Sequence, residues 1–151
     1  MKFVIQRVTH AKCEVDGQIT GAIEEGFCVF IGVSDRDTRE IADKMLHKML
    51  GLRIFSDEND KTNLSLRNVN GGLLMISQFT LYADCRKGNR PSFIGAGKPE
   101  LANELYEYLI AQAKKEIPEV QCGVFGADMN ISLCNQGPFT IVLDSDELRF
   151  S

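Results

Sequence analysis

The sequence predicts an α+β fold in a single domain that spans residues 1–151. Two observations predict it. Strand-like segments alternate with two segments of helical periodicity in the order strands, helix, strands, helix, strands, without internal repeats or low-complexity segments. A chain of 151 residues also has the length of one domain and can bury most of the surface that it would expose when unfolded.

The first segments have the alternation of β-strands. Residues 2–9 alternate in character, residues 13–15 continue the pattern, and Asp16-Gly17 is a typical turn, so we expect a hairpin. Residues 27–31 then form a continuous apolar run, which is typical of a strand that is covered on both faces.

The first helix is predicted after this strand. Asp37 and Glu40 have the spacing of a capping box, and Gly51 can end the helix. Its apolar residues recur on one face, so we expect this face to pack on the core. They are Ile41, Ala42, Met45, Leu46, Met49 and Leu50.

A strand over residues 52–55 and a polar run over residues 56–63 are expected next. The acidic start of the polar run suggests a calcium loop. However, Thr62 and Asn68 occupy the positions where an EF-hand has its glycine and its closing glutamate. We interpret the run as a surface loop.

The middle of the chain combines an apolar strand with a basic stretch. Residues 72–76 form the apolar run, which closes on the hexapeptide Ser77–Tyr82. The basic stretch contains Arg86, Lys87 and Arg90. These side chains either contact phosphates or belong to a solvated loop.

A second helix and three strands complete the chain. Pro99 suits the first turn of the helix, which ends near Ile117-Pro118. Its apolar face consists of Leu101, Ala102, Leu105, Tyr108, Leu109 and Ala113. The closing strands are expected over residues 120–125, 130–134 and 139–144.

Composition excludes several classes of protein. No apolar run approaches the roughly 20 residues of a membrane helix, so we expect no membrane partner. One lysine before a strand-like alternation is not a secretory signal, so we expect a cytoplasmic protein. Five dispersed cysteines and two histidines form no disulfide or metal-binding pattern, so we expect neither a metal nor another cofactor.

The hexapeptide Asn135–Thr140 contains Gly137-Pro138, a pair that specifies a rigid bend with bare carbonyls. Taken alone, the bend is either an ordinary turn between two strands or a piece of backbone placed for chemistry. The flanking strands would hold it at the end of a sheet.

Ser77–Tyr82 and Asn135–Thr140 together resemble the paired signatures of D-aminoacyl-tRNA deacylases, an S-Q-x-T-L segment and an N-x-G-P-x-T segment. The start of the chain over residues 1–8, the strand end at residues 32–33 and the segment over residues 125–129 also resemble that family. The resemblance follows the family's order along the whole chain.

The resemblance implies largely antiparallel β-sheets packed on each other, with two main amphipathic helices outside them. It also implies a homodimer that hydrolyses the ester between a D-amino acid and the acceptor end of tRNA. Glycyl-tRNA is expected as a further substrate, because glycine has no side chain to reject. The net charge of −4 means that contact with RNA must be local.

In the first signature, no histidine, lysine or terminal amine can be assigned as a base to Thr80 or Ser77. The resemblance instead implies oxyanion stabilisation by the N–H groups of Phe79 and Thr80, with Gln78 and the Thr80 hydroxyl ordering the site. The 2′-hydroxyl of the tRNA would then assist the reaction. Direct attack by Thr80 is the alternative mechanism.

In the second signature, the resemblance implies that Gly137 and Pro138 enter the partner subunit's pocket and turn carbonyls towards the substrate's α-carbon. Arg7 would brace this bend. The residues matching the family segment that receives the terminal adenine are Phe125, Gly126 and Met129. A noncatalytic module that binds RNA ends or an amino acid through the same pocket is the alternative function.

Overall fold

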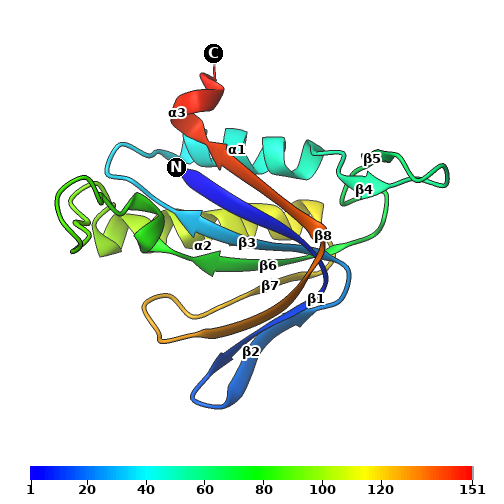
Figure 1. Ribbon diagram of the computed structural model, residues 1–151, viewed down its shortest axis with the longest axis horizontal. Coiled ribbons are helices and arrows are strands. Elements are labelled where there is room, and N and C mark those ends of the chain that lie inside the picture. Colours follow the sequence, from blue (N-terminus) through cyan, green and yellow to red (C-terminus); the bar gives the residue numbers. More distant parts are fainter. Residues whose placement is uncertain (151) are drawn as a thin grey trace.

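A curved six-stranded sheet with two helices packed against one of its faces forms the frame of the molecule (Figure 1). The computed structural model describes residues 1–150. Its elements are β1 (Lys2–Val15), β2 (Gln18–Ile23), β3 (Gly26–Gly32), α1 (Arg39–Gly51), β4 (Phe55–Ser56), β5 (Thr62–Leu64), β6 (Gly72–Ser77), the 3₁₀ turn η1 (Phe79–Tyr82), α2 (Pro99–Glu116), β7 (Val120–Cys122), β8 (Asn130–Asp144) and α3 (Ser145–Leu148). The predicted α+β class is confirmed.

Strand β1 organises the sheet because it has three antiparallel partners. Its first half, over residues 2–8, lies between β3 and β8, and its second half, over residues 11–15, lies between β2 and β8. The register shifts between Val8 and Ala11, where β1 curves (Figure 1). The predicted hairpin of β1 and β2 is confirmed, with the turn at Asp16-Gly17 in the left-handed region.

Strands β3 and β6 are parallel neighbours, and both are buried on both faces. One set of side chains packs with the helices in the main core, and the alternate set packs against residues of β1, β2 and β8 in a second cluster. The first set includes Phe27, Val29, Leu73 and Met75, and the second includes Cys28, Leu74 and Ile76. The prediction of a strand covered on both faces is therefore confirmed for residues 27–31.

Both helices form where periodicity predicts them, but the cap of α1 differs. Thr38 caps this helix, since its Oγ1 accepts a hydrogen bond from the N–H of Ile41 at 3.2 Å. The capping box of Asp37 with Glu40 is wrong. Asp37 instead accepts hydrogen bonds from the buried N-terminal ammonium of Met1 at 2.8 Å and from the N–H of Ser34 at 2.7 Å.

Two of the expected strands are shorter than predicted. The strand over residues 52–55 is reduced to β4, which pairs with β5 in a two-stranded ribbon where we expected a loop. The strand over residues 120–125 ends at Cys122, since the chain then turns away into the loop before β8.

The two last predicted strands are one strand, β8, and the Gly-Pro bend lies inside it and not at a sheet end. Asn135 lies opposite Val8 and Thr140 lies opposite Gln6, so five steps along β8 face only two along β1. The additional residues bulge out of the ladder. A hairpin turn is thereby excluded, because both flanks pair with the same neighbour.

Candidate functional site

A cavity of about 690 Å³ opens beside the end of β6. Its walls come from η1, from the loop between β7 and β8, and from the start of α2 with the segment that precedes it. Among the lining residues are six that the sequence singled out: Ser77, Gln78, Phe79, Phe125, Gly126 and Met129. The fold brings together two segments that are almost 50 residues apart in sequence.

The first wall is the Ser77–Tyr82 signature, which leaves the sheet at the end of β6. The N–H of Gln78 makes the last bond to the sheet, 2.7 Å from the carbonyl oxygen of Ile31, and η1 then folds back over the end of β3. Gly32 permits this approach, because a Cβ there would lie 3.0 Å from the Cβ of Leu81. The signature is therefore held against a buried strand.

The start of η1 presents two free backbone donors. The first N–H groups of a helical turn have no acceptor within the turn. Across residues 1–150, neither a backbone nor a side-chain acceptor takes the N–H of Phe79 or Thr80. Gln78 Nε2 donates to Thr80 Oγ1 at 2.6 Å, and this is the one partner of that hydroxyl in the described chain. Thr80 lies beside the cavity lining and has no adjacent base.

The opposite wall, the loop before β8, is mainly apolar. Met129 lies over the backbone of Gly123, where an added Cβ would come within 2.5 Å of its sulfur. The Phe125 ring is 6.2 Å from the ring of Tyr106, whose hydroxyl donates to the Met75 carbonyl at 2.7 Å. Burial raises the pKa of Tyr106, so this hydroxyl stays protonated and acts as a structural donor.

The Gly-Pro bend is closed by the side chain of Asn135. Its Oδ1 accepts from the N–H of Phe139 at 2.9 Å, while its Nδ2 donates to Gln6 Oε1 and to Thr140 Oγ1. The Gly137–Pro138 peptide bond is cis, and Gly137 has φ +126°. The Asn135 side chain thus links the start of the bulge to its end and to β1.

Arg7 lies under the bend. Its Nε and Nη2 both donate to the carbonyl oxygen of Gln136, at 3.2 and 2.9 Å, and its Nη1 donates to the carbonyl oxygen of Ile54 at 2.8 Å. The guanidinium is also 4.6 Å from the centre of the Phe139 ring. Arg7 therefore ties the bend to the segment that leads into β4.

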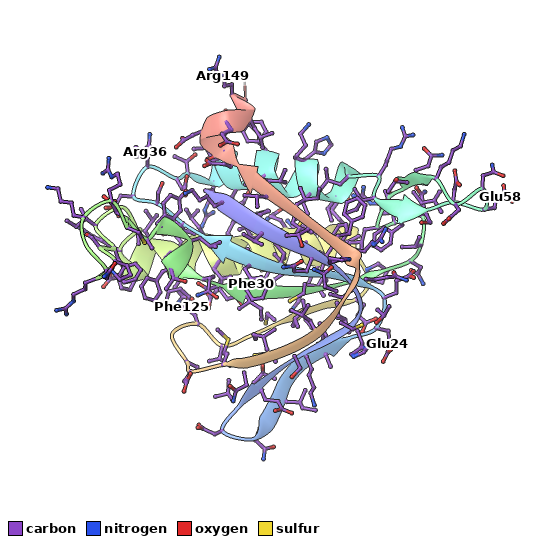
Figure 2. The ribbon with its side chains drawn as sticks, viewed as in Figure 1. Glu24, Phe30, Arg36, Glu58, Phe125 and Arg149 are labelled. Carbon is purple, nitrogen blue, oxygen red and sulfur yellow. The ribbon has the colours of Figure 1, made fainter. Side chains whose placement is uncertain are left out.

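Within one chain, the bend and the cavity are separate. None of Arg7, Gly137 and Pro138 lines the large cavity, and Arg7 and Gln136 border a different hollow of about 150 Å³. Figure 1 shows β4 and β5, next to the bend, at one end of the molecule and the basic stretch after η1 at the other. Figure 2 likewise places Glu58, on the β4–β5 loop, and Phe125 towards opposite ends.

Two groups of residues had no role assigned to them from the sequence. Phe93 and Lys98 line the cavity. The one signal of this in the sequence was an aromatic residue within a basic stretch. Gln6, Asn135 and Thr140 form a polar cluster around the bend. Its signal was a set of polar residues within segments that alternate apolar and polar side chains.

Neither a metal-binding cluster nor a membrane-spanning helix is found in the described part of the chain. Residues 1–150 contain no group of three or more histidine, cysteine or acidic side chains that could hold a metal ion. No helix in the same range is long and apolar enough to cross a membrane.

Comparison with known proteins identifies the family. The model of the D-Tyr-tRNA(Tyr) deacylase family matches residues 4–144. The D-aminoacyl-tRNA deacylase of Stutzerimonas stutzeri is 52% identical over 96% of this chain and all of its own length, and that of Pseudoalteromonas translucida is 54% identical over 95% and 99%.

Two solved structures share the fold of this chain. A c-Myc DNA unwinding element binding protein superimposes with a TM-score of 0.90 at 39% identity, covering 95% of this chain and 98% of its own. A probable eukaryotic D-amino acid tRNA deacylase has the same fold, with a TM-score of 0.78 at 18% identity over 94% and 97% of the two chains. Because the family model and the relatives match over almost the entire length, this chain belongs to the D-Tyr-tRNA(Tyr) deacylase family.

Proposed function

We propose that this protein hydrolyses the ester bond of D-aminoacyl-tRNA, releasing the D-amino acid and tRNA, and that it also accepts glycyl-tRNA. The observation that carries the proposal is the cavity, which brings the Ser77–Tyr82 signature and the segment over residues 125–129 together around two free backbone donors. Curated relatives of 52% and 54% identity are D-aminoacyl-tRNA deacylases, which supports the same reaction here. Aminoacyl-tRNA is a cytoplasmic substrate, so we place the protein in the cytoplasm.

The free N–H groups of Phe79 and Thr80 suit the negative charge that develops on the ester carbonyl oxygen. One preset donor of this kind contributes about 2.7–4 kcal/mol to the stabilisation of a transition state. Gln78 holds the Thr80 hydroxyl at 2.6 Å, which orders the same turn. Since Thr80 has no base, the 2′-hydroxyl of the terminal ribose assists the attack of water, and Phe125, Gly126 and Met129 receive the adenine.

The bend needs a second subunit to reach a cavity. In an isologous homodimer, each Gly137-Pro138 bend enters the partner's cavity, so that two equivalent sites form. There the carbonyls form a wall that an L side chain meets, whereas a D side chain points outward. Arg7 keeps this wall in place through its bonds to Gln136.

An apolar row on the face of the sheet away from the helices supports this pairing. Val142 lies opposite Val4 on β1, and Val4 lies opposite Phe30 on β3, so the three side chains share one face. Val142 is 62% exposed in the single chain. A partner subunit would cover this row, and sedimentation should then give twice the 16.8 kDa of one chain.

The second candidate is a noncatalytic nucleic-acid-binding module, which the similarity to a DNA unwinding element binding protein favours. The net charge of −4 argues against extended duplex binding. Hydrolysis of D-tyrosyl-tRNA in large molar excess over the protein separates the two. Many turnovers, with L-tyrosyl-tRNA left intact, support the deacylase, whereas binding without turnover supports the module.

A further inference from the structure

We propose that residues 85–98, named here the basic loop, bind the phosphodiester backbone of the single-stranded 3′ end of tRNA while its terminal ribose occupies the cavity. This inference rests on the proposed function, and it assigns the part of the surface that holds the RNA beyond the last nucleotide.

The basic loop concentrates positive charge in an acidic protein. The basic loop contains Arg86, Lys87, Arg90 and Lys98 and no aspartate or glutamate, in a chain whose net charge is −4. Phosphate contacts supply much of the affinity of proteins for nucleic acids. An acidic protein that handles RNA therefore needs a local concentration of cations, and this loop has one.

Three of these four cations are available to RNA. Arg86 is engaged by Asp84, with its Nη2 2.7 Å and its Nε 2.9 Å from the carboxylate oxygens. The guanidinium lowers the pKa of Asp84 to about 2, so the carboxylate is ionised at neutral pH and Arg86 has a charged partner there. Lys87, Arg90 and Lys98 have no carboxylate within ion-pair distance in residues 1–150.

The basic loop has a defined position in the fold. Asp84 and Ser92 exchange backbone hydrogen bonds of 2.7 and 2.9 Å, which close off the tip that carries Lys87 and Arg90. At the other end, the N–H of Gly97 donates to the Val33 carbonyl at 2.8 Å. The tip is therefore anchored at its base and directed into solvent (Figure 1).

The basic loop also lies at the edge of the cavity. Phe93 and Lys98 line the cavity itself, and the Phe93 ring packs edge to face on Phe79 with 5.0 Å between ring centres. Both rings are partly exposed, at 38% for Phe93 and 54% for Phe79. Exposed aromatic rings beside free cations are the usual composition of surfaces that bind single-stranded nucleic acid, since bases stack on rings while cations meet phosphates.

These features order the contacts along the RNA. The terminal nucleotide lies in the cavity, and Lys98 at its rim is nearest to the phosphate of that nucleotide. The tip with Lys87 and Arg90 lies further out and meets the preceding phosphates. The contacts carry no sequence information, so the loop should serve different tRNAs equally.

The test compares Lys87→Ala/Arg90→Ala with wild type on two substrates. D-tyrosyl-tRNA has the phosphodiester backbone, whereas D-tyrosyl-adenosine has none. Lys48→Ala/Lys114→Ala is the matched control, because it removes the same charge from exposed, unbridged positions on α1 and α2.

We expect the loop variant to lose at least tenfold in kcat/KM on D-tyrosyl-tRNA at low salt and to keep wild-type kcat/KM on D-tyrosyl-adenosine. Removing two phosphate contacts should also make the plot of log kcat/KM against log salt concentration shallower by about 1.4, at ~0.7 for each contact to a single strand. The control variant should match wild type on both substrates.

Two results would overturn the inference. Equal losses on both substrates would mean that the variant distorts the cavity, and unchanged kcat/KM on D-tyrosyl-tRNA would mean that the loop is merely solvated. Failure of the proposed function looks different, because wild type itself would then hydrolyse neither substrate.

Discussion

Replacing Gly137 with alanine tests the role of the bend in chirality. The residue has φ +126°, a conformation that L residues with side chains rarely adopt. An added Cβ would lie 3.1 Å from Arg7 Nη2 and 3.3 Å from the N–H nitrogen of Phe139. Arg7 cannot retreat freely, because its Nη1 is bonded to the Ile54 carbonyl at 2.8 Å. The bend itself must therefore shift.

The size of the effect follows from two costs. Holding a residue with a side chain in a rarely populated backbone region costs about 1–3 kcal/mol. Loss of the hydrogen bond between Arg7 and the Gln136 carbonyl costs about 1.5–3 kcal/mol, since its donor is charged. The bend can avoid either cost only by shifting, and this shift moves the carbonyl wall. Each ~1.4 kcal/mol lost from discrimination is tenfold in the ratio of the two rates. We expect the ratio of D- to L-substrate hydrolysis to fall by roughly ten- to hundredfold.

The assay is kcat/KM for D- and L-tyrosyl-tRNA, measured on variants whose oligomeric state is checked by sedimentation. Gly17→Ala is the matched control, because Gly17 has φ +77° and nothing within 4 Å of an added Cβ. It should keep the wild-type ratio. A folded Gly137→Ala protein of wild-type oligomeric state whose ratio is also unchanged would refute the reasoning.

Three further predictions concern stability, thiols and catalysis. Asp37→Ala leaves the buried ammonium of Met1 without its carboxylate. The free energy of unfolding, measured in urea, should therefore fall by about 3–5 kcal/mol, and a loss below ~1 kcal/mol would contradict this. At pH 8 a thiol reagent should label only the exposed Cys85 and Cys134 rapidly, because Cys13 and Cys28 are buried and Cys122 is half-buried. Burial also raises the pKa of Cys28 to about 12, so that thiol stays protonated. Fast labelling of a third cysteine in the folded protein would argue against this prediction. A substrate that ends in 2′-deoxyadenosine should be nearly inert, whereas Thr80→Val should keep measurable activity; the opposite ranking would indicate attack by Thr80.

Local patterns predicted most elements, because they depend on residues close in sequence. The apolar run over residues 27–31 and the apolar faces of both helices are patterns of this kind, and the fold uses them as expected. The cap of α1 was wrong because the carboxylate of Asp37 binds an ammonium 36 residues away, a contact that no capping pattern records. Likewise, Gly137-Pro138 signals a turn, but only pairing of both flanks with β1 shows that the bend lies inside one strand.

The candidate site could likewise be predicted only in part from the sequence. The signature residues could be named from the sequence, and the fold gathers Ser77, Phe79 and Phe125 at one cavity. Phe93 could not be placed there, because its position depends on the bridges that anchor the basic loop to distant backbone. That the bend lies away from its own chain's cavity is a property of the folded sheet and is absent from any motif.

The most direct test of the account is a photo-cross-link from the bend. Gln136 has an exposed side chain and lies outside the β1 ladder, so a diazirine-bearing amino acid can replace it. Isotope-labelled and unlabelled chains are mixed, irradiated and digested, and the linked peptides are identified by mass. The account predicts links between a labelled and an unlabelled chain that join the bend to residues 76–79 or 125–131 of the partner. Links confined to a single chain, or to surfaces away from the cavity, would contradict it.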